Sequence, residues 1–175
     1  MAKGSKATPK NQEQINIINT VAHESKQREI RSKNFITRGI STPPSTDQSI
    51  PKDQEKNEIL KIFHLLGADT TNIASHFRLK PSIKTPTLPG PIIVIMTDDK
   101  ARTNVLKQAS LFFRNTNNRS KHSTLSINAD MTLNEQNHAY LLRTECRKRN
   151  SSLSASATTI NVIRENSIKE IQKDH

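Results

Sequence analysis

One arginine, Arg38, lies inside the otherwise apolar run "NFITRGI". Side chains alternate across a strand, so Phe35 and Thr37 would point to one face of a sheet. Ile36 and Arg38 would then point to the opposite face. If helices cover only the first face, the guanidinium of Arg38 is free to donate hydrogen bonds to a phosphate or a base. The following Gly39 would leave the end of the strand unobstructed. A solvated arginine, or one paired with a carboxylate, is the alternative.

Basic residues are abundant, and many of them are concentrated in one part of the chain. The sequence holds 27 Lys and Arg against 16 Asp and Glu, a formal net charge of +11. Residues 100–150 alone hold ten basic and three acidic residues. This balance favours a polyanionic partner. The candidate nucleic-acid-binding residues are Arg38, Arg78, Lys80, Arg102, Arg114, Arg119, Lys121, Arg143, Arg147, Lys148 and Arg149.

Three of these cations, Arg114, Arg119 and Lys121, are expected in a loop, together with His122. Four others lie near the end of a predicted helix: Arg143, Arg147, Lys148 and Arg149. Cations at a helix C-terminus are also favoured by the helix dipole, which is a purely structural explanation for them. Four cations within seven residues nevertheless exceed what capping requires.

Residues that could perform catalysis or hold a metal are poorly arranged for either task. Asp98 and Asp99 are adjacent at the start of a predicted helix and suit capping better than metal binding. The six histidines are scattered, and the single cysteine, Cys146, excludes an internal disulfide and a thiolate zinc site. We therefore expect no enzyme, metal or cofactor, and we disfavour a fragment of an endonuclease or reverse transcriptase.

The N-terminal part of the chain predicts a tail and a helix. Residues 1–12 are polar and basic and predict a disordered tail, because they cannot offset their own ordering entropy. Residues 13–31 predict a helix with Ile15, Ile18 and Ala22 at heptad-like spacing. This coiled-coil remnant is shorter than three or four heptads, so we expect at most a weak homo-oligomer. No stretch approaches the roughly 18 apolar residues that span a bilayer, and no signal peptide is evident. We expect an intracellular protein, cytoplasmic or nuclear, without a membrane partner.

Residues 32–131 predict one α/β domain. A Ser/Thr/Pro loop follows the strand of Arg38, and a helix then ends at Gly67. Its apolar face holds Ile59, Ile62, Phe63 and Leu66. A half-buried strand with Ile73, Phe77 and Leu79 comes next, and then the apolar strand "PIIVIM". A helix capped by Asp98 and a strand with Leu125 and Ile127 complete the domain. The inner face of that helix holds Ala101, Val105, Ala109 and Phe112.

This order, β-α-β-β-α-β, predicts an α+β fold of the ferredoxin-like type, with two helices covering one face of a four-stranded antiparallel sheet. RNA-recognition modules use the same layout and bind unpaired bases on the uncovered face. Residues 132–175 predict an extension. Thr132 and Glu135 form a capping box for its helix, and a hairpin turns at Asn166 and Ser167.

The chain resembles the RNA-recognition-like domain of first-reading-frame proteins of non-LTR retrotransposons, and related nucleic-acid-binding frames linked to reverse transcriptases. The similar segments are "RSKNFITRGI", "IFHLLGAD", "FRLKP", "PIIVIM" followed by "ARTNVLKQA", and "SINADMTLNEQNHAYLLRTECRKR", within Arg31 to Asn150. The resemblance implies a homotrimer held by an upstream coiled coil, which binds single-stranded RNA as a nucleic-acid chaperone. With its short helix, this chain corresponds to a truncated or domesticated copy.

The side chains on the uncovered face of the predicted sheet are compatible with two kinds of partner, nucleic acid and protein. Ile93 and Ile95 should point outward, and they are apolar without being aromatic. We therefore expect weak base stacking, with phosphate contacts supplying most of the affinity for single-stranded RNA or DNA. The alternative is an interaction or self-association module, in which Ile36, Ile93 and Ile95 pack against protein.

Overall fold

The computed structural model describes residues 12–40, 52–81, 83, 89–154, 156–164 and 166–172. The predicted basic tail, apart from its last residue, and nearly all of the Ser/Thr/Pro loop lie outside these residues. The chain divides into two compact units, Met1–Asp130 and Met131–His175, and each is described by itself. No helix among the described residues is long and apolar enough to cross a membrane.

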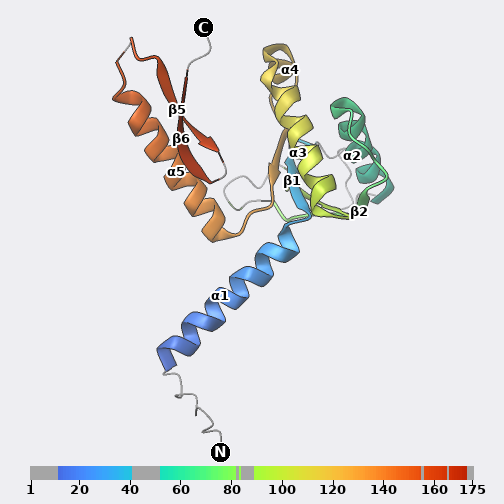
Figure 1. Cartoon of the computed structure of the whole chain (residues 1–175). Helices are drawn as coiled ribbons and strands as arrows, with labels where there is room; N and C mark the ends of the chain where they lie inside the picture. The colour runs from blue at the N-terminus through green and yellow to red at the C-terminus, as the bar shows by residue number, and fades with distance from the viewer. Residues whose placement is uncertain are drawn as a thin grey trace, which may run out of the picture. The chain divides into compact units, whose positions relative to one another are not determined.

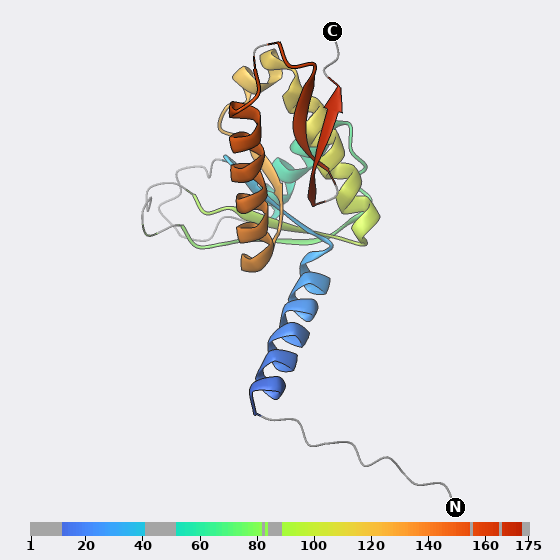
Figure 2. The same ribbon diagram turned by 60° about the vertical axis from the view of Figure 1, so that its left-hand side comes forward.

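The first unit begins with the predicted N-terminal helix, α1 (Gln12–Arg31), which leads directly into strand β1 (Asn34–Arg38) (Figure 2). None of the residues of α1 is buried, and Ile15 and Ile18 are among its exposed apolar side chains. The heptad-like positions therefore pack against nothing within the described part of this chain.

The first unit contains a four-stranded antiparallel sheet with strand order β2-β3-β1-β4. After β1 the elements are α2 (Lys52–Leu66), β2 (Ile73–Arg78), β3 (Ile92–Met96), α3 (Asp99–Arg114), α4 (Thr116–Lys121) and β4 (Ser126–Ala129). Figure 1 shows α2 and α3 side by side next to the strands. The expectation of a mixed α+β chain is confirmed.

The core lies between the sheet and the helices α2 and α3. The apolar face predicted for α2 is buried at all four positions, and α3 contributes Val105 and Ala109. On the sheet side the core residues are Phe35, Ile92, Val94 and Met96. Phe35 and Phe63 are in ring contact, with centroids 6.0 Å apart. On the other face of the sheet Asn34 and Ile93 are also buried, whereas Ile36 and Ile95 are half-buried.

Local capping signals explain where several helices begin and end. Asp98 accepts a hydrogen bond from the backbone N–H of Ala101 (2.7 Å), which lowers the pKa of its carboxyl group. Gly67 has a φ of +65° directly after the last residue of α2, as expected for a helix stop. The prediction of a loop for Arg114, Arg119 and Lys121 is wrong, because Arg114 ends α3 and the other two lie in a further helix. Asn115 caps a new helix, α4, by accepting from the N–H of Asn117 (2.9 Å).

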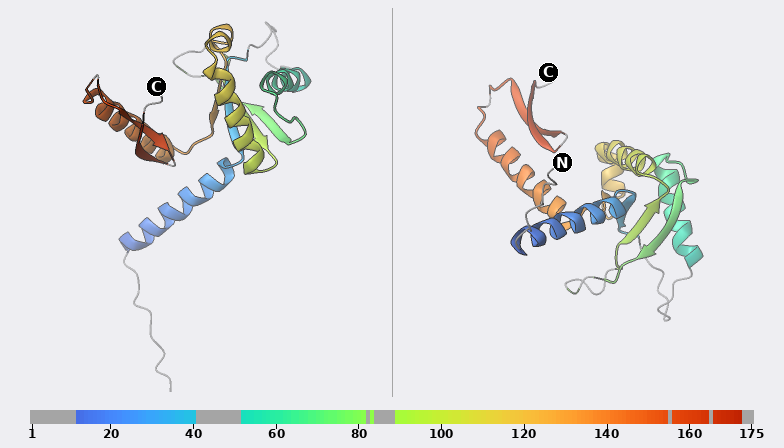
Figure 3. Two further views of the ribbon diagram at one scale, coloured as in Figure 1. Left: turned by 45° about the horizontal axis from the view of Figure 1, so that its top comes forward. Right: turned by 60° about the horizontal axis from the view of Figure 1, so that its bottom comes forward.

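The second unit consists of helix α5 (Leu133–Ser151) and the hairpin of β5 (Thr159–Arg164) and β6 (Ser167–Gln172), which lie against each other (Figure 3). The predicted capping box of Thr132 and Glu135 is confirmed. Asn150 joins helix to hairpin, since its amide donates to the carbonyl oxygen of Asn161 (2.8 Å) and accepts from the N–H of that residue (2.8 Å).

Asn166 lies in the turn of this hairpin as predicted, but Ser167 does not. Ser167 pairs with Arg164 and is already the first residue of β6. Asn166 takes the left-handed conformation of the turn, with a φ of +56°. Asparagine tolerates this conformation better than most residues, which suits it to the turn.

Replacing Thr37 by valine is expected to stabilise the protein by about 1 kcal/mol. Thr37 is 2% exposed, faces the core, and its hydroxyl oxygen has no hydrogen-bond partner among the described residues. Valine has nearly the same shape and removes the unsatisfied polar group. Thr132→Val is the matched control, because that buried hydroxyl accepts from the N–H of Glu135. It should destabilise by about 1 kcal/mol in urea denaturation; a loss of stability in both variants would contradict the prediction.

Candidate nucleic-acid interface

The strand register assigns each side chain of the sheet to one of its two faces, because directly opposed residues share a face. Phe35 and Thr37 lie opposite Val94 and Ile92 and face the core, as predicted. The other face, which we call the open face, carries Ser75, Phe77, Ile93, Ile95, Asn34, Ile36, Arg38, Ser126 and Asn128.

Arg38 lies on the open face at the end of β1, opposite Ser126 of β4. Its side chain is exposed, and no carboxylate of the described residues pairs with it. The alternative that Arg38 is paired with a carboxylate is therefore not supported by the described residues. A planar guanidinium that no carboxylate occupies keeps all its donors for an external oxygen anion.

Phe77 is a residue of the open face that sequence reasoning assigned to the wrong side. The alternation of Ile73, Phe77 and Leu79 suggests one common buried face, but the pairing of β2 with β3 shifts register between Ile73 and Ser75. Ile73 therefore packs against the core, whereas Phe77 lies opposite Ile93 on the open face and is 46% exposed. A bulge of this kind reverses the alternation beyond it. No local signal in the sequence marks it.

The open face thus has a largely apolar row across its strands, and Arg38 lies two residues further along β1. Phe77, Ile93 and Ile36 lie side by side on β2, β3 and β1, and Asn128 of β4 completes the row. From strand spacing and rise, the Cα atoms of Phe77 and Arg38 are roughly 12 Å apart. An aromatic ring can stack an unpaired base, and an arginine at this separation can contact a phosphate of the same strand.

Two predicted site residues, Arg78 and Arg102, make structural contacts instead. Arg78 points toward the core side and forms an ion pair with Glu55 of α2 (Nε to Oε1, 2.8 Å). It also donates to the carbonyl oxygen of Gly90 (2.8 Å). Arg102 of α3 donates to the carbonyl oxygen of Asn34 (3.2 Å). These contacts hold the guanidinium groups inside the domain, so we leave both residues out of the interface.

The other predicted cations are exposed but belong to different parts of the chain. Those of the first unit lie after β2, at the end of α3 and on α4: Lys80, Arg114, Arg119 and Lys121. Those of the second unit lie on α5: Arg143, Arg147, Lys148 and Arg149. Arg149 donates to Glu145 (2.9 Å), and this bond lowers the pKa of the Glu145 carboxyl group. The structure therefore gathers only Arg38, of the predicted residues, on the open face.

A buried carboxylate holds the start of β1 in place. Asp130, at the end of β4, accepts hydrogen bonds from Arg31 of α1 (3.0 Å) and from the side chain of Asn34 (3.2 Å). The ion pair neutralises Arg31, and the Asn34 amide ties β1 to β4. These bonds position the strand whose far end carries Arg38.

No protein-family model matches the sequence, and no curated protein shows significant similarity to it. Within the described ranges, no group of three or more His, Cys, Asp and Glu side chains is arranged to hold a metal ion.

Proposed function

We propose that this protein binds single-stranded nucleic acid, RNA in the first place, through the open face of its sheet. The observation that carries the proposal is the presence of an exposed aromatic ring, Phe77, and an exposed arginine, Arg38, on a sheet face opposite the helices of its unit, where no carboxylate of the described residues pairs with Arg38. Stacking on aromatic rings and charge contacts with the backbone are the two contributions that hold unpaired strands. The net charge of +11 supports the same kind of partner.

We further propose that the domain is ferredoxin-like and functions as an RNA-recognition-like module. The element order from β1 to β4 and the strand order β2-β3-β1-β4, with α2 and α3 on one face, support this classification. It agrees with the resemblance to first-reading-frame proteins of non-LTR retrotransposons, and a nucleic-acid chaperone of that kind is the role we propose. The basic helix α5 of the second unit would make phosphate contacts of its own.

The binding mode differs in one respect from a purely electrostatic one. Phe77 stands at the edge strand β2, so a base can stack there. The central strand β3 offers only the half-buried Ile95, because Ile93 is buried. One stacking residue gives little base specificity, because every base has a π-face. We therefore expect binding that depends weakly on sequence and strongly on salt.

The test is a titration of labelled single-stranded RNA by fluorescence anisotropy over a salt series. Phe77→Ala should weaken binding roughly tenfold, the loss of one stacked base, without changing the salt slope. Arg38→Ala should weaken binding and also reduce the slope of log K against log salt by about 0.7, the loss of one phosphate contact. Both side chains are exposed, so the unfolding midpoints should stay the same.

Two variants on α3 serve as matched controls for this test. Leu111 is 48% exposed, as Phe77 is, and Lys107 is exposed, and neither belongs to the open face. Leu111→Ala should leave the affinity unchanged, and Lys107→Ala should have a smaller effect than Arg38→Ala. A wild-type protein without affinity for RNA at low salt would reject the proposal. Salt-independent association with a protein partner through Ile36 and Ile95, the two half-buried isoleucines of the open face, would establish the interaction-module alternative.

A further inference from the structure

A pocket of about 370 Å³ lies in the first unit, between α2 and the segment that joins α4 to β4. Its volume falls within the range of roughly 300–1,000 Å³ that is typical of small-molecule sites. Its apolar lining consists of Ile40, Ile62, Leu65 and Leu125. Leu65 is 38% exposed, so this lining is accessible from solvent.

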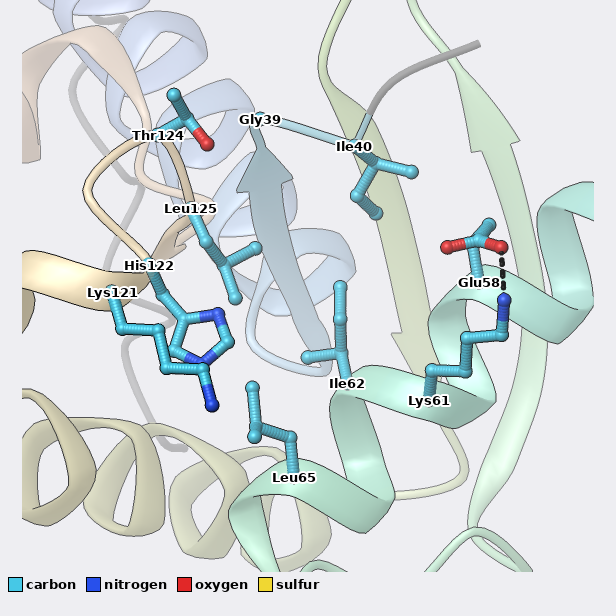
Figure 4. A pocket seen from close by; sticks show the side chains of 10 residues that line it. All are labelled: Gly39, Ile40, Glu58, Lys61, Ile62, Leu65, Lys121, His122, Thr124 and Leu125. Atoms are coloured by element: carbon cyan, nitrogen blue, oxygen red, sulfur yellow. Dashed lines mark hydrogen bonds and ion pairs between the residues drawn. The ribbon is translucent and has the colours of Figure 1, made fainter. Parts of the chain in front are cut away.

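The polar groups of the pocket stand on opposite sides of the apolar lining (Figure 4). On one side are Lys121, the last residue of α4, and His122, which follows it. On the other side Lys61 is bound to Glu58 of the same helix, with Nζ and Oε1 2.6 Å apart. That pair is neutral overall. Lys121 has no carboxylate partner among the described residues, so it is the cation that can receive an anion.

The imidazole of His122 is held in place as one wall of the pocket. Its ring contacts the ring of Phe112, with centroids 5.6 Å apart and planes tilted by 53°. A flat ring beside aliphatic side chains provides the surface on which another planar, largely apolar ring can pack. A lysine ammonium next to it is suited to an anionic group attached to that ring system. The combination fits a nucleotide better than a free anion or a hydrocarbon.

The pocket adjoins the open face through one residue. Gly39 lines it and follows Arg38 directly, so the two Cα atoms are about 3.8 Å apart. The backbone of Thr124, another lining residue, packs where a Gly39 side chain would lie. A strand whose phosphate is bound by Arg38 would pass around this contact to reach the pocket.

We infer that this pocket binds one unpaired nucleotide, with its base against Ile62, Leu65 and His122 and its phosphate at Lys121. The inference rests on the proposed function in that the nucleotide would belong to the strand held on the open face. It adds a second recognition site, on residues that lie outside that face. Glu58 restrains the affinity, because its carboxylate neutralises Lys61 and keeps that second cation from attracting the phosphate.

The test uses the full chain and three probes: uridine 5′-monophosphate, uridine and inorganic phosphate. In an NMR titration, the nucleotide should shift the amide signals of Ile62 and of residues 121–125, and it should bind at least tenfold more tightly than either of the other probes. Lys121→Gln should weaken binding of the nucleotide about tenfold, through loss of a charge-assisted contact. Glu58→Gln should strengthen it about threefold. Lys107→Gln is the matched control and should change nothing.

The outcomes separate this inference from the proposed function. If RNA binding depends on Arg38 and Phe77 while the nucleotide binds no more tightly than phosphate, the pocket inference is wrong and the sheet proposal stands. If nucleotide binding depends on Lys121 but RNA affinity does not change on substitution of Arg38 or Phe77, the sheet proposal is wrong and the pocket inference stands. Equal effects of Lys121→Gln and Lys107→Gln on nucleotide binding would also overturn the inference. Both lysines are exposed, so misfolding should not intervene.

Discussion

Replacing Gly39 by alanine is expected to cost the protein about 3 kcal/mol of folding free energy. Gly39 has a φ of +85°, which strains any residue with a Cβ atom. A Cβ at this position would also lie 2.0 Å from the carbonyl oxygen of Thr124 and 2.9 Å from the backbone nitrogen of Leu125. Backbone atoms cannot rotate away as a side chain would, so the end of β1 and the start of β4 would have to separate. Urea denaturation of the full chain measures the loss.

Gly67→Ala is the matched control for this substitution. Gly67 has a φ of +65°, but no atom lies within 4 Å of the position that a Cβ would take. Only the backbone strain applies there, and the expected loss is about 1 kcal/mol. If the two alanine variants lose the same stability, the close approach of Gly39 to Thr124 is not present in solution. The pocket beside Gly39 would then have a different shape.

The second large effect is expected from Glu55→Ala, which should destabilise the protein by about 3 kcal/mol. The Glu55 and Arg78 side chains are only 10% and 16% exposed, so the substitution leaves an uncompensated, largely buried guanidinium. The double variant Glu55→Met, Arg78→Met removes both charges together. It should recover most of the stability, because apolar side chains of similar volume replace the pair without leaving a charge.

The ion pair of Glu58 and Lys61, one turn further along α2, is the control for this prediction. Its side chains are 39% and 71% exposed, and Glu58→Ala should therefore cost less than about 1 kcal/mol. A small loss for Glu55→Ala as well would mean that Arg78 reaches solvent and remains available as a ligand-binding residue. The measurement thus also decides whether Arg78 belongs to the interface.

Much of the helical structure could be predicted from the sequence, because its causes are local. The apolar spacing of Ile59, Ile62, Phe63 and Leu66 requires a helix with one buried face. Asp98, and Thr132 with Glu135, mark helix starts by hydrogen bonds that span three residues. The face of Arg38 could also be predicted, since β1 is regular and Phe35 and Thr37 alternate with it.

Arg78 and Phe77 show what only the tertiary structure decided. In the sequence, Arg78 resembles Arg38, an arginine at the end of a short strand. The register shift in β2 turns Arg78 toward the core side, where Glu55 of α2 binds it, and turns Phe77 outward. A strand's register depends on the summed pairing and burial along its neighbour, and no residue within β2 carries that information.

The pocket, like the register of β2, depends on contacts between segments that are distant in the sequence. Its walls come from the end of β1, from α2 and from the region of Lys121 and His122, segments that are far apart in the sequence. Local patterns predicted most of these elements but not their juxtaposition, and they missed the helix that ends at Lys121. Packing of α2 and α3 on the sheet brings the segments together, because the free energy of burying their apolar faces exceeds any local preference for where a polar side chain lies.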